Sequence, residues 1–141
     1  MPLRITAESD LDFGCLVARG VGEVVVSSAD GSASYTGGVQ SVGGAGCSHA
    51  PALFAVAGAP GREYRYLVEP VAYASHSVFA DETLLVRDLA GSSGHASASG
   101  STGLLDPAGR DRLKVGGTLV VPEGARPGRY RARITVTVAY M

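Results

Sequence analysis

The fold is decided by the stretch Gly128-Arg129-Tyr130-Arg131-Ala132-Arg133-Ile134-Thr135-Val136-Thr137-Val138-Ala139-Tyr140-Met141, at the end of the sequence. Its even positions from 130 to 140 carry Tyr, Ala, Ile or Val, whereas the odd positions from 129 to 137 carry Arg or Thr. Successive strand side chains point to opposite faces, so this two-residue period is typical of a strand that buries one face. We therefore predict one half-buried β-strand over residues 128–141. Such a strand needs a neighbour along each backbone edge, because an unpaired edge is a template for another chain.

Shorter stretches with similar alternation come earlier in the sequence, separated by turns that contain Gly or Pro. Ala29-Asp30-Gly31 and Gly58-Ala59-Pro60-Gly61 are two of these turns. The clearest further strands are predicted at 11–17, 23–27, 35–42, 52–57, 64–68 and 113–121. No stretch has a convincing helical period. About eight strands at roughly ten-residue spacing favour a single antiparallel β-sandwich domain over residues 1–141.

The composition argues against several classes of protein. With a net charge of −1 and 18% charged residues, the sequence has no basic stripe to neutralise phosphates, so nucleic acid is not an expected partner. Arg129, Arg131 and Arg133 are interpreted as a solvated face rather than a basic ladder. No apolar run approaches the roughly 20 residues of a membrane-spanning helix. Residues 1–4 show no apolar core of a signal peptide.

Two cysteines, Cys15 and Cys47, leave one possible internal pairing. Each lies at the end of a strand-like segment, and closing a loop of about 30 residues contributes on the order of 3 to 4 kcal/mol in the chain-entropy model. We predict a disulfide between them, which is typical of an exported protein. The alternative is two buried thiols, because sequence alone does not fix the distance between the two Cα atoms.

Few side chains suggest catalysis or ligand binding. The histidines, His49, His76 and His95, are scattered among small polar residues, and Cys47-Ser48-His49 offers only one fragment with metal-ligand spacing. The sequence contains no G-x-S-x-G elbow, no G-x-x-x-x-G-K-[ST] loop and no calcium-binding loop. We therefore expect no enzyme, no cofactor and no metal site.

Several fragments together resemble a known family. They are Leu11-Asp12-Phe13-Gly14, Tyr35-Thr36-Gly37-Gly38-Val39, Phe54-Ala55-Val56-Ala57-Gly58-Ala59-Pro60-Gly61, Leu104-Leu105-Asp106, Val115-Gly116-Gly117-Thr118-Leu119, Pro127-Gly128-Arg129-Tyr130 and Thr135-Val136-Thr137-Val138-Ala139-Tyr140. In these fragments the chain resembles exported bacterial domains of unknown function that are related to spore coat protein U and archaic chaperone–usher pilins. The resemblance implies an immunoglobulin-like β-sandwich that lacks its final strand. A chaperone, and later a neighbouring subunit, supplies that strand in pilins.

The resemblance also implies a site. Pilins carry a penultimate Tyr and a Gly 14 residues from the end, and Tyr140 and Gly128 match these positions here. Gly128 is expected to let an incoming backbone approach closely. The groove for the added strand is expected to be lined by Tyr130, Ala132, Ile134, Val136, Val138 and Tyr140. The alternative is that these residues fill a complete core. A pilin's donor extension should precede its first strand, yet only a short segment precedes Leu11, so polymerisation through such an extension stays open.

Two functions follow as expectations. The first is a non-enzymatic, exported structural subunit of a fimbria-like or surface-coat assembly, located in the periplasm, on the cell surface or outside the cell. Its partners would be other protein subunits or a periplasmic chaperone, with a homo-oligomer as one form. The second is a binding module or adhesin that recognises carbohydrate or a host surface through loops, with Ala90 to Gly103 as the contact region. Tyr64, Tyr66 and Tyr73 are interpreted as core or sheet-face residues, with stacking on sugar rings as the alternative.

Overall fold

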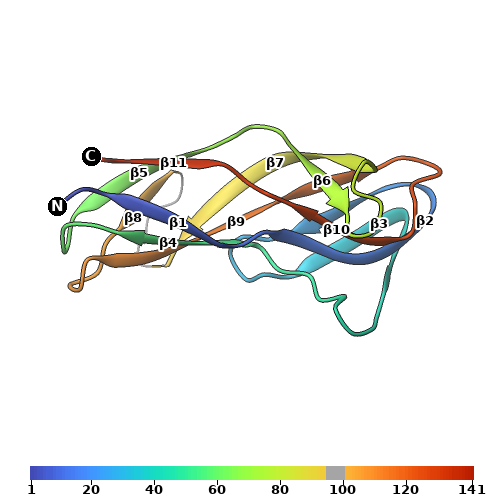
Figure 1. Ribbon diagram of the computed structural model, residues 1–141, viewed down its shortest axis with the longest axis horizontal. Coiled ribbons are helices and arrows are strands. Elements are labelled where there is room, and N and C mark those ends of the chain that lie inside the picture. Colours follow the sequence, from blue (N-terminus) through green and yellow to red (C-terminus); the bar gives the residue numbers. More distant parts are fainter. Residues whose placement is uncertain (95–100) are drawn as a thin grey trace.

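The computed structural model describes residues 1–94 and 101–141, and these residues form eleven β-strands and no helix (Figure 1). The strands are β1 (Arg4–Ser9), β2 (Leu11–Val26), β3 (Ala33–Val42), β4 (Ala52–Ala57), β5 (Glu63–Val68), β6 (Ala72–His76), β7 (Thr83–Ser93), β8 (Thr102–Leu104), β9 (Arg110–Val121), β10 (Gly128–Ala132) and β11 (Val136–Tyr140). All their ladders are antiparallel. The predicted all-β, antiparallel class is confirmed.

The strands form two sheets, the larger of which closes on itself. Its order is β1-β4-β9-β7-β6-β10-β2-β3, and an additional pairing of β9 with β2 joins β9, β7, β6, β10 and β2 into a ring. The smaller sheet has the order β11-β5-β8. Figure 1 shows an elongated molecule in which β11 and β5 lie at the end that carries both termini. The closed ring is an element that a simple sandwich of two open sheets does not contain.

The length of β2 makes the ring possible. Residues 11–16 of this strand pair with β10, whereas residues 22–26 pair with β9. The sequence predicted two separate strands here, and they are one strand of 16 residues. At the change of partner, Gly22 lies so close to Thr36 and Val39 that a Cβ atom would overlap both of them. A residue without a side chain therefore permits the close approach of β2 and β3 at this point.

The predicted strand at 128–141 is divided in two, which corrects the single-strand interpretation. β10 pairs with β2 and β6 in the larger sheet, and β11 pairs with β5 in the smaller one. Residues 133–135 cross between the sheets without belonging to a strand. The two-residue period continues through the crossing, because Ile134 is buried like Tyr130 and Ala132. Alternation records which face is buried, and it carries no information on which strand is the partner.

A buried polar contact connects the two sheets. The hydroxyl of Tyr64, on β5, donates a hydrogen bond of 2.5 Å to Oδ2 of Asp111, on β9. Ser93 donates to the same carboxylate oxygen. Burial raises the pKa of Tyr64 well above its ordinary value, and the bond to Asp111 adds to this effect. The phenol therefore stays protonated, as its role as a donor requires.

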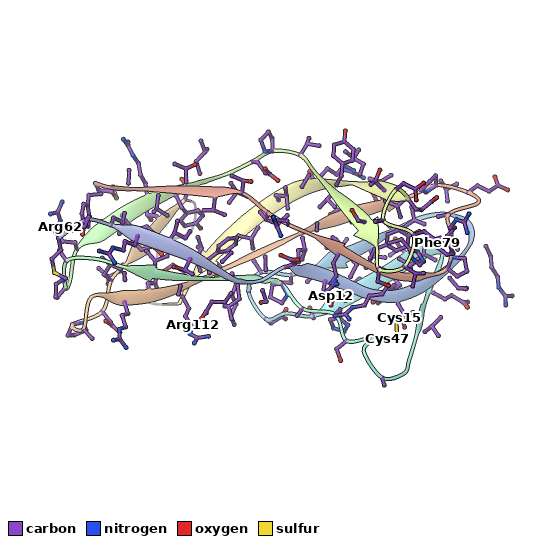
Figure 2. All side chains as sticks on the ribbon, viewed as in Figure 1. Asp12, Cys15, Cys47, Arg62, Phe79 and Arg112 are labelled. Carbon is purple, nitrogen blue, oxygen red and sulfur yellow. A yellow bond between two sulfur atoms is a disulfide. The ribbon has the colours of Figure 1, made fainter. Side chains whose placement is uncertain are left out.

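The predicted disulfide between Cys15 and Cys47 is present, with their Cα atoms 4.9 Å apart (Figure 2). It fastens the connection between β3 and β4 to β2. The same connection is held by Asp12 and Ala50, which exchange two backbone hydrogen bonds of 2.9 Å. The connection is thus attached to β2 by one covalent bond and one short ladder.

Replacing both cysteines, as Cys15→Ala with Cys47→Ala, is expected to lower the free energy of unfolding by about 2 to 4 kcal/mol, because the unfolded chain loses a cross-link. Guanidinium chloride unfolding followed by far-UV circular dichroism measures this change. The native protein with and without a thiol reductant is the matched control. An unchanged unfolding midpoint in the double variant would show that the disulfide adds no stability.

Candidate functional site

The candidate site is the boundary between β1 and β11, which we call the seam. Within the described residues, β1 pairs only with β4 and β11 pairs only with β5. Each therefore has a second backbone edge without a partner strand. The two strands lie close enough for some of their residues to be neighbours, and Figure 1 shows both at the end of the molecule that carries the termini. Two unpaired edges thus border one narrow region.

The hydrogen bonds of β11 show which of its peptide groups face the seam. Glu69 donates its backbone N–H to the carbonyl oxygen of Thr135 at 3.2 Å, and Met141 donates to Glu63 at 3.3 Å. Because peptide groups in an antiparallel ladder alternate between the two edges, Thr137 and Ala139 also face β5. The backbone groups of Val136, Val138 and Tyr140 point the other way. No strand of the described chain pairs with them.

The side chains of these residues form an apolar floor. Val136, Val138 and Tyr140 are half-buried and pack against the core, whereas Thr137 and Ala139 between them are exposed. Leu3 and Ile5, on the other side of the seam, are also half-buried against the core. The seam therefore combines unpaired backbone groups with incompletely covered apolar side chains.

A hollow of about 350 Å³ lies where the chain crosses from β10 to β11. Phe54 and Ile134 are its nearly buried apolar residues, with 4% and 5% of their surface exposed. The other lining residues are Ala7, Glu8, Ser9, Asp10 and Arg133. The hollow thus borders β1 on one side and the crossing that leads into β11 on the other.

Tyr140 closes the opposite end of the seam. Its hydroxyl accepts a hydrogen bond of 2.7 Å from the backbone N–H of Ala59 and donates one of 2.8 Å to the carbonyl oxygen of Met1. The guanidinium of Arg62 lies 4.3 Å from the centre of its ring. The penultimate residue of the sequence therefore connects β11 to the start of the chain and to the turn after β4.

The other residues of the predicted groove lie elsewhere. Gly128 and Tyr130 belong to β10, which has a partner strand on both edges, so they do not border the seam. Tyr130 is fully buried, and its hydroxyl donates to the carbonyl oxygen of Arg126 at 2.8 Å. Burial is also the main reason why its pKa is raised. The predicted site therefore narrows to Val136, Val138 and Tyr140, with Ile134 at the adjoining hollow.

Gly128 has a structural role within the chain itself. Its φ angle is 142°, and a Cβ atom here would overlap the imidazole of His76. Nδ1 of His76 accepts hydrogen bonds from the backbone N–H groups of Val78 and Phe79, at 3.0 and 3.2 Å. Nε2 is therefore the protonated nitrogen, and it donates to the carbonyl oxygen of Pro127 at 2.9 Å. Close approach at Gly128 thus serves His76, a partner that sequence reasoning did not identify.

The structure also bears on the predicted contact region, on metal ligands and on membrane-spanning helices. Of the proposed contact region from Ala90 to Gly103, residues 90–93 belong to β7 and residues 102–103 to β8, and residues 95–100 lie outside the described part of the chain. Among the described residues, no three His, Cys, Asp or Glu side chains are placed to hold a metal ion. Within residues 1–94 and 101–141, no helix has the length and apolar character needed to cross a membrane.

Sequence reasoning missed the contribution of β1 to the seam. The alternation of Leu3 and Ile5 with exposed neighbours indicates a strand in this stretch, without indicating where that strand lies. That stretch pairs with β4 and brings its free edge near β11. Nothing in the alternation of residues 3–5 indicates this position, because the pairing partner is more than 40 residues away in sequence and is set by the tertiary fold.

The variant Gly128→Ala is expected to lower the free energy of unfolding by about 1 to 3 kcal/mol, because its Cβ overlaps the ring of His76. Gly43→Ala is the matched control, since a Cβ at that position meets nothing within 4 Å. Chemical denaturation of both variants measures the difference. Equal stability of Gly128→Ala and the native protein would contradict the internal role of this glycine.

Tyr140→Phe removes the hydroxyl that joins Ala59 to Met1, and we expect a loss of about 1 to 3 kcal/mol from the two unmade hydrogen bonds. Tyr73→Phe is the control, because 62% of Tyr73 is exposed and a change within about 0.5 kcal/mol is typical of such a site. Thermal unfolding of the two variants tests the contrast. If both lose the same stability, the bridge made by Tyr140 has no energetic role.

Comparison with known proteins identifies a family and no activity. The model of the family described as Domain of unknown function (DUF4402) matches residues 3–140. Neither a curated protein nor a solved structure matches the chain. The family match covers β1, β11 and the strands between them, and therefore includes both edges of the seam. The chain belongs to the DUF4402 family.

Proposed function

We propose that this protein is a non-enzymatic, exported structural subunit of a fimbria-like or surface-coat assembly, and that it accepts an extended segment of another protein subunit in the seam. The observation that carries the proposal is the free edge of β11. Among the described residues, no strand pairs with the backbone groups of Val136, Val138 and Tyr140 that face away from β5, and the side chains of these three residues are half-buried. A strand placed there gains main-chain hydrogen bonds along the edge and covers the apolar floor.

The chemistry of the seam specifies the occupant. A strand alongside β11 presents alternate side chains to the floor, so the proposed segment has apolar residues at every second position. Five residues of β11 are available, which corresponds to about 17 Å of ladder. The alternating stretch at Leu3 and Ile5 already pairs with β4, so it does not supply the inserted segment, and the proposal assigns that segment to another protein subunit. A periplasmic chaperone is the other source of such a strand that the resemblance to pilins suggests.

The free edge of β3 is a poorer place for strand addition. β3 forms the opposite end of the larger sheet, and its exposed residues include Ser34, Thr36 and Gln40. Gly37, within this strand, has a φ angle of 68°, which interrupts a regular ladder. The seam combines an unpaired backbone edge with apolar side chains against which incoming side chains can pack. The edge of β3 provides mainly unpaired backbone groups.

Further support comes from the sequence. The resemblance to coat and pilin domains implies assembly by strand addition, and a disulfide is typical of proteins outside the reducing cytoplasm. The proposal concerns the acceptor role. It does not use Arg4–Ser9 as a donor segment, since these residues form β1.

A labelled ten-residue peptide in which Val and Thr alternate is a direct probe of the seam. We expect it to bind the native protein more tightly than a peptide of the same composition with the valines clustered, because clustering removes the match to the floor. Fluorescence anisotropy measures both affinities. Absence of binding, or equal binding of the two peptides, would count against the proposal.

Two neighbouring substitutions on β11 then localise the binding. Val138→Asp places a carboxylate on the half-buried face and is expected to weaken binding of the alternating peptide by about tenfold or more. Thr137→Asp introduces the same group on the exposed face and is expected to leave binding within about twofold. Circular dichroism shows whether both variants are folded. Equal effects of the two substitutions on binding would place the peptide outside the seam.

A further inference from the structure

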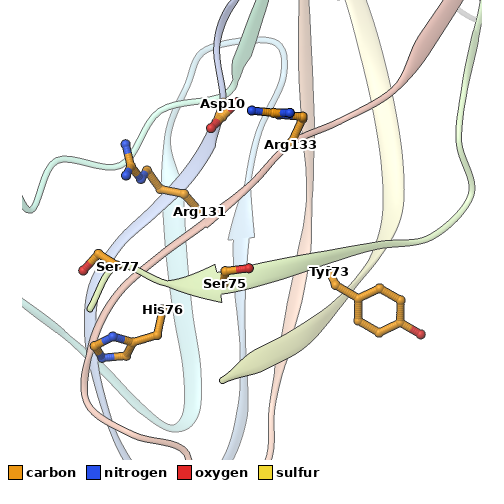
Figure 3. A pocket seen from close by; sticks show the side chains of 7 residues that line it. All are labelled: Asp10, Tyr73, Ser75, His76, Ser77, Arg131 and Arg133. Atoms are coloured by element: carbon orange, nitrogen blue, oxygen red, sulfur yellow. The ribbon is translucent and has the colours of Figure 1, made fainter. Parts of the chain in front are cut away.

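A second recess lies on the outer face of the larger sheet, away from the apolar floor of the seam. We call it the outer-face pocket, and it has a volume of about 300 Å³. It is lined by Asp10, Tyr73, Ser75, His76, Ser77, Arg131 and Arg133 (Figure 3). Figure 3 shows Tyr73 and Ser75 on β6 and Ser77 just after it, with the two arginine side chains and Asp10 above the same strand in this view. Charged groups, hydroxyls and one aromatic ring thus share a single recess.

The pairing of three strands explains this arrangement. Arg131 on β10 lies directly across from Ser75 on β6 and from Asp12 on β2. In such a ladder, residues directly opposite one another have neighbouring side chains on the same face. Two positions further along the chain, the side chain of Arg133 points to the same side as that of Arg131, and it joins Asp10 and Tyr73 in lining the pocket.

The three arginines at 129, 131 and 133 differ in whether they form an ion pair within the described chain. Arg129 donates from Nε to Oδ2 of Asp12 at 3.0 Å, and this bond is the main reason why its pKa is raised. Arg131 and Arg133 form no ion pair with any residue of the described chain, and both are exposed. The pocket therefore holds two unmatched guanidinium groups and one carboxylate, that of Asp10.

His76 lines the pocket without being available to a ligand. It is 5% exposed, and both ring nitrogens already hold backbone groups, at Pro127 on one side and at Val78 and Phe79 on the other. Its ring contacts Tyr130 edge-on and lies 5.2 Å from the ring centre of Phe79. His76 is a fixed part of the wall, and the side chains that remain free to bind are polar or exposed.

We propose that the outer-face pocket binds a carboxylated saccharide, such as a hexuronic acid unit of an acidic polysaccharide. A guanidinium group binds a carboxylate through two parallel charge-assisted hydrogen bonds, which is the role of Arg131 and Arg133. The carboxylate of Asp10 accepts hydrogen bonds from sugar hydroxyls, and the hydroxyls of Ser75 and Ser77 donate to them or accept from them. The ring of Tyr73, which is 62% exposed, supplies a surface on which a sugar ring packs.

The carboxylate of Asp10 selects between classes of anion. It opposes a highly charged group such as a phosphate, whereas a sugar acid brings one negative charge together with several hydroxyl donors. An acidic peptide also carries a carboxylate, but it lacks the several hydroxyl groups of a sugar ring. The inference does not depend on strand addition, because none of the pocket residues belongs to β1 or β11.

The test compares D-galacturonate with D-galactose, which differ in the carboxylate alone, by nuclear magnetic resonance titration of the native protein. We expect galacturonate to shift the amide signals of Ser75, Arg131 and Arg133 at millimolar concentration and galactose to shift them much less. Salt should weaken the effect, because the charges are exposed to solvent. Absence of shifts with galacturonate, or equal shifts with galactose, overturns the proposal.

Variants assign the contacts. Arg131→Gln with Arg133→Gln is expected to weaken galacturonate binding by about tenfold or more, and Tyr73→Ala by a smaller factor with the charges retained. Arg65→Gln is the matched control, since Arg65 is an exposed strand arginine outside the pocket, and binding should stay unchanged. Equal losses in the double variant and the control overturn the site. Equally tight binding of tri-glutamate or of inorganic phosphate overturns the assignment to a saccharide.

Discussion

The dual pairing of β2 is the constraint on which the rest of the structure depends. One strand of 16 residues holds β10 along its first half and β9 along its second, and thereby closes five strands into a ring. The ring fixes β10 on both sides, so the chain leaves the larger sheet after Ala132 and continues as β11 in the smaller one. Among the described residues, β1 and β11 lie outside the ring, and each has one edge without a partner strand. The seam is thus a consequence of how the ring closes.

The two proposed binding regions differ in the chemical groups that each presents. The seam presents backbone groups over apolar side chains, which suits an extended polypeptide that adds to a sheet edge. The outer-face pocket presents side-chain charges and hydroxyls over a completed part of the sheet, which suits a small polar ligand. They meet near Asp10 and Arg133, which line both the outer-face pocket and the hollow at the start of β11. The proposed protein partner and the proposed saccharide would therefore bind at adjoining places that share these two lining residues.

The alternation at 130–140 was sufficient to predict which side chains are buried, because the period of a strand is a local property. It was not sufficient to predict the division into β10 and β11, since residues 133–135 change partner without changing face. The pairing of Cys15 with Cys47 followed from there being only two cysteines. The contact of Gly128 with His76, and the pairing of Arg129 with Asp12 rather than with solvent, join residues far apart in sequence. Such contacts depend on the tertiary fold, and no local pattern encodes them.

The phenol of Tyr140 has a mechanical consequence. Residues 1 and 141 lie together at one end of the molecule (Figure 1), where this phenol joins β11 to Met1. A tension applied between the termini therefore does not pull along the strands in shear. It separates β11 from β1 across the seam and then β11 from β5, beginning at the C-terminal end of β11. The hydrogen bonds of Met141 to Glu63 and of Tyr140 to Met1 are the first to carry that load.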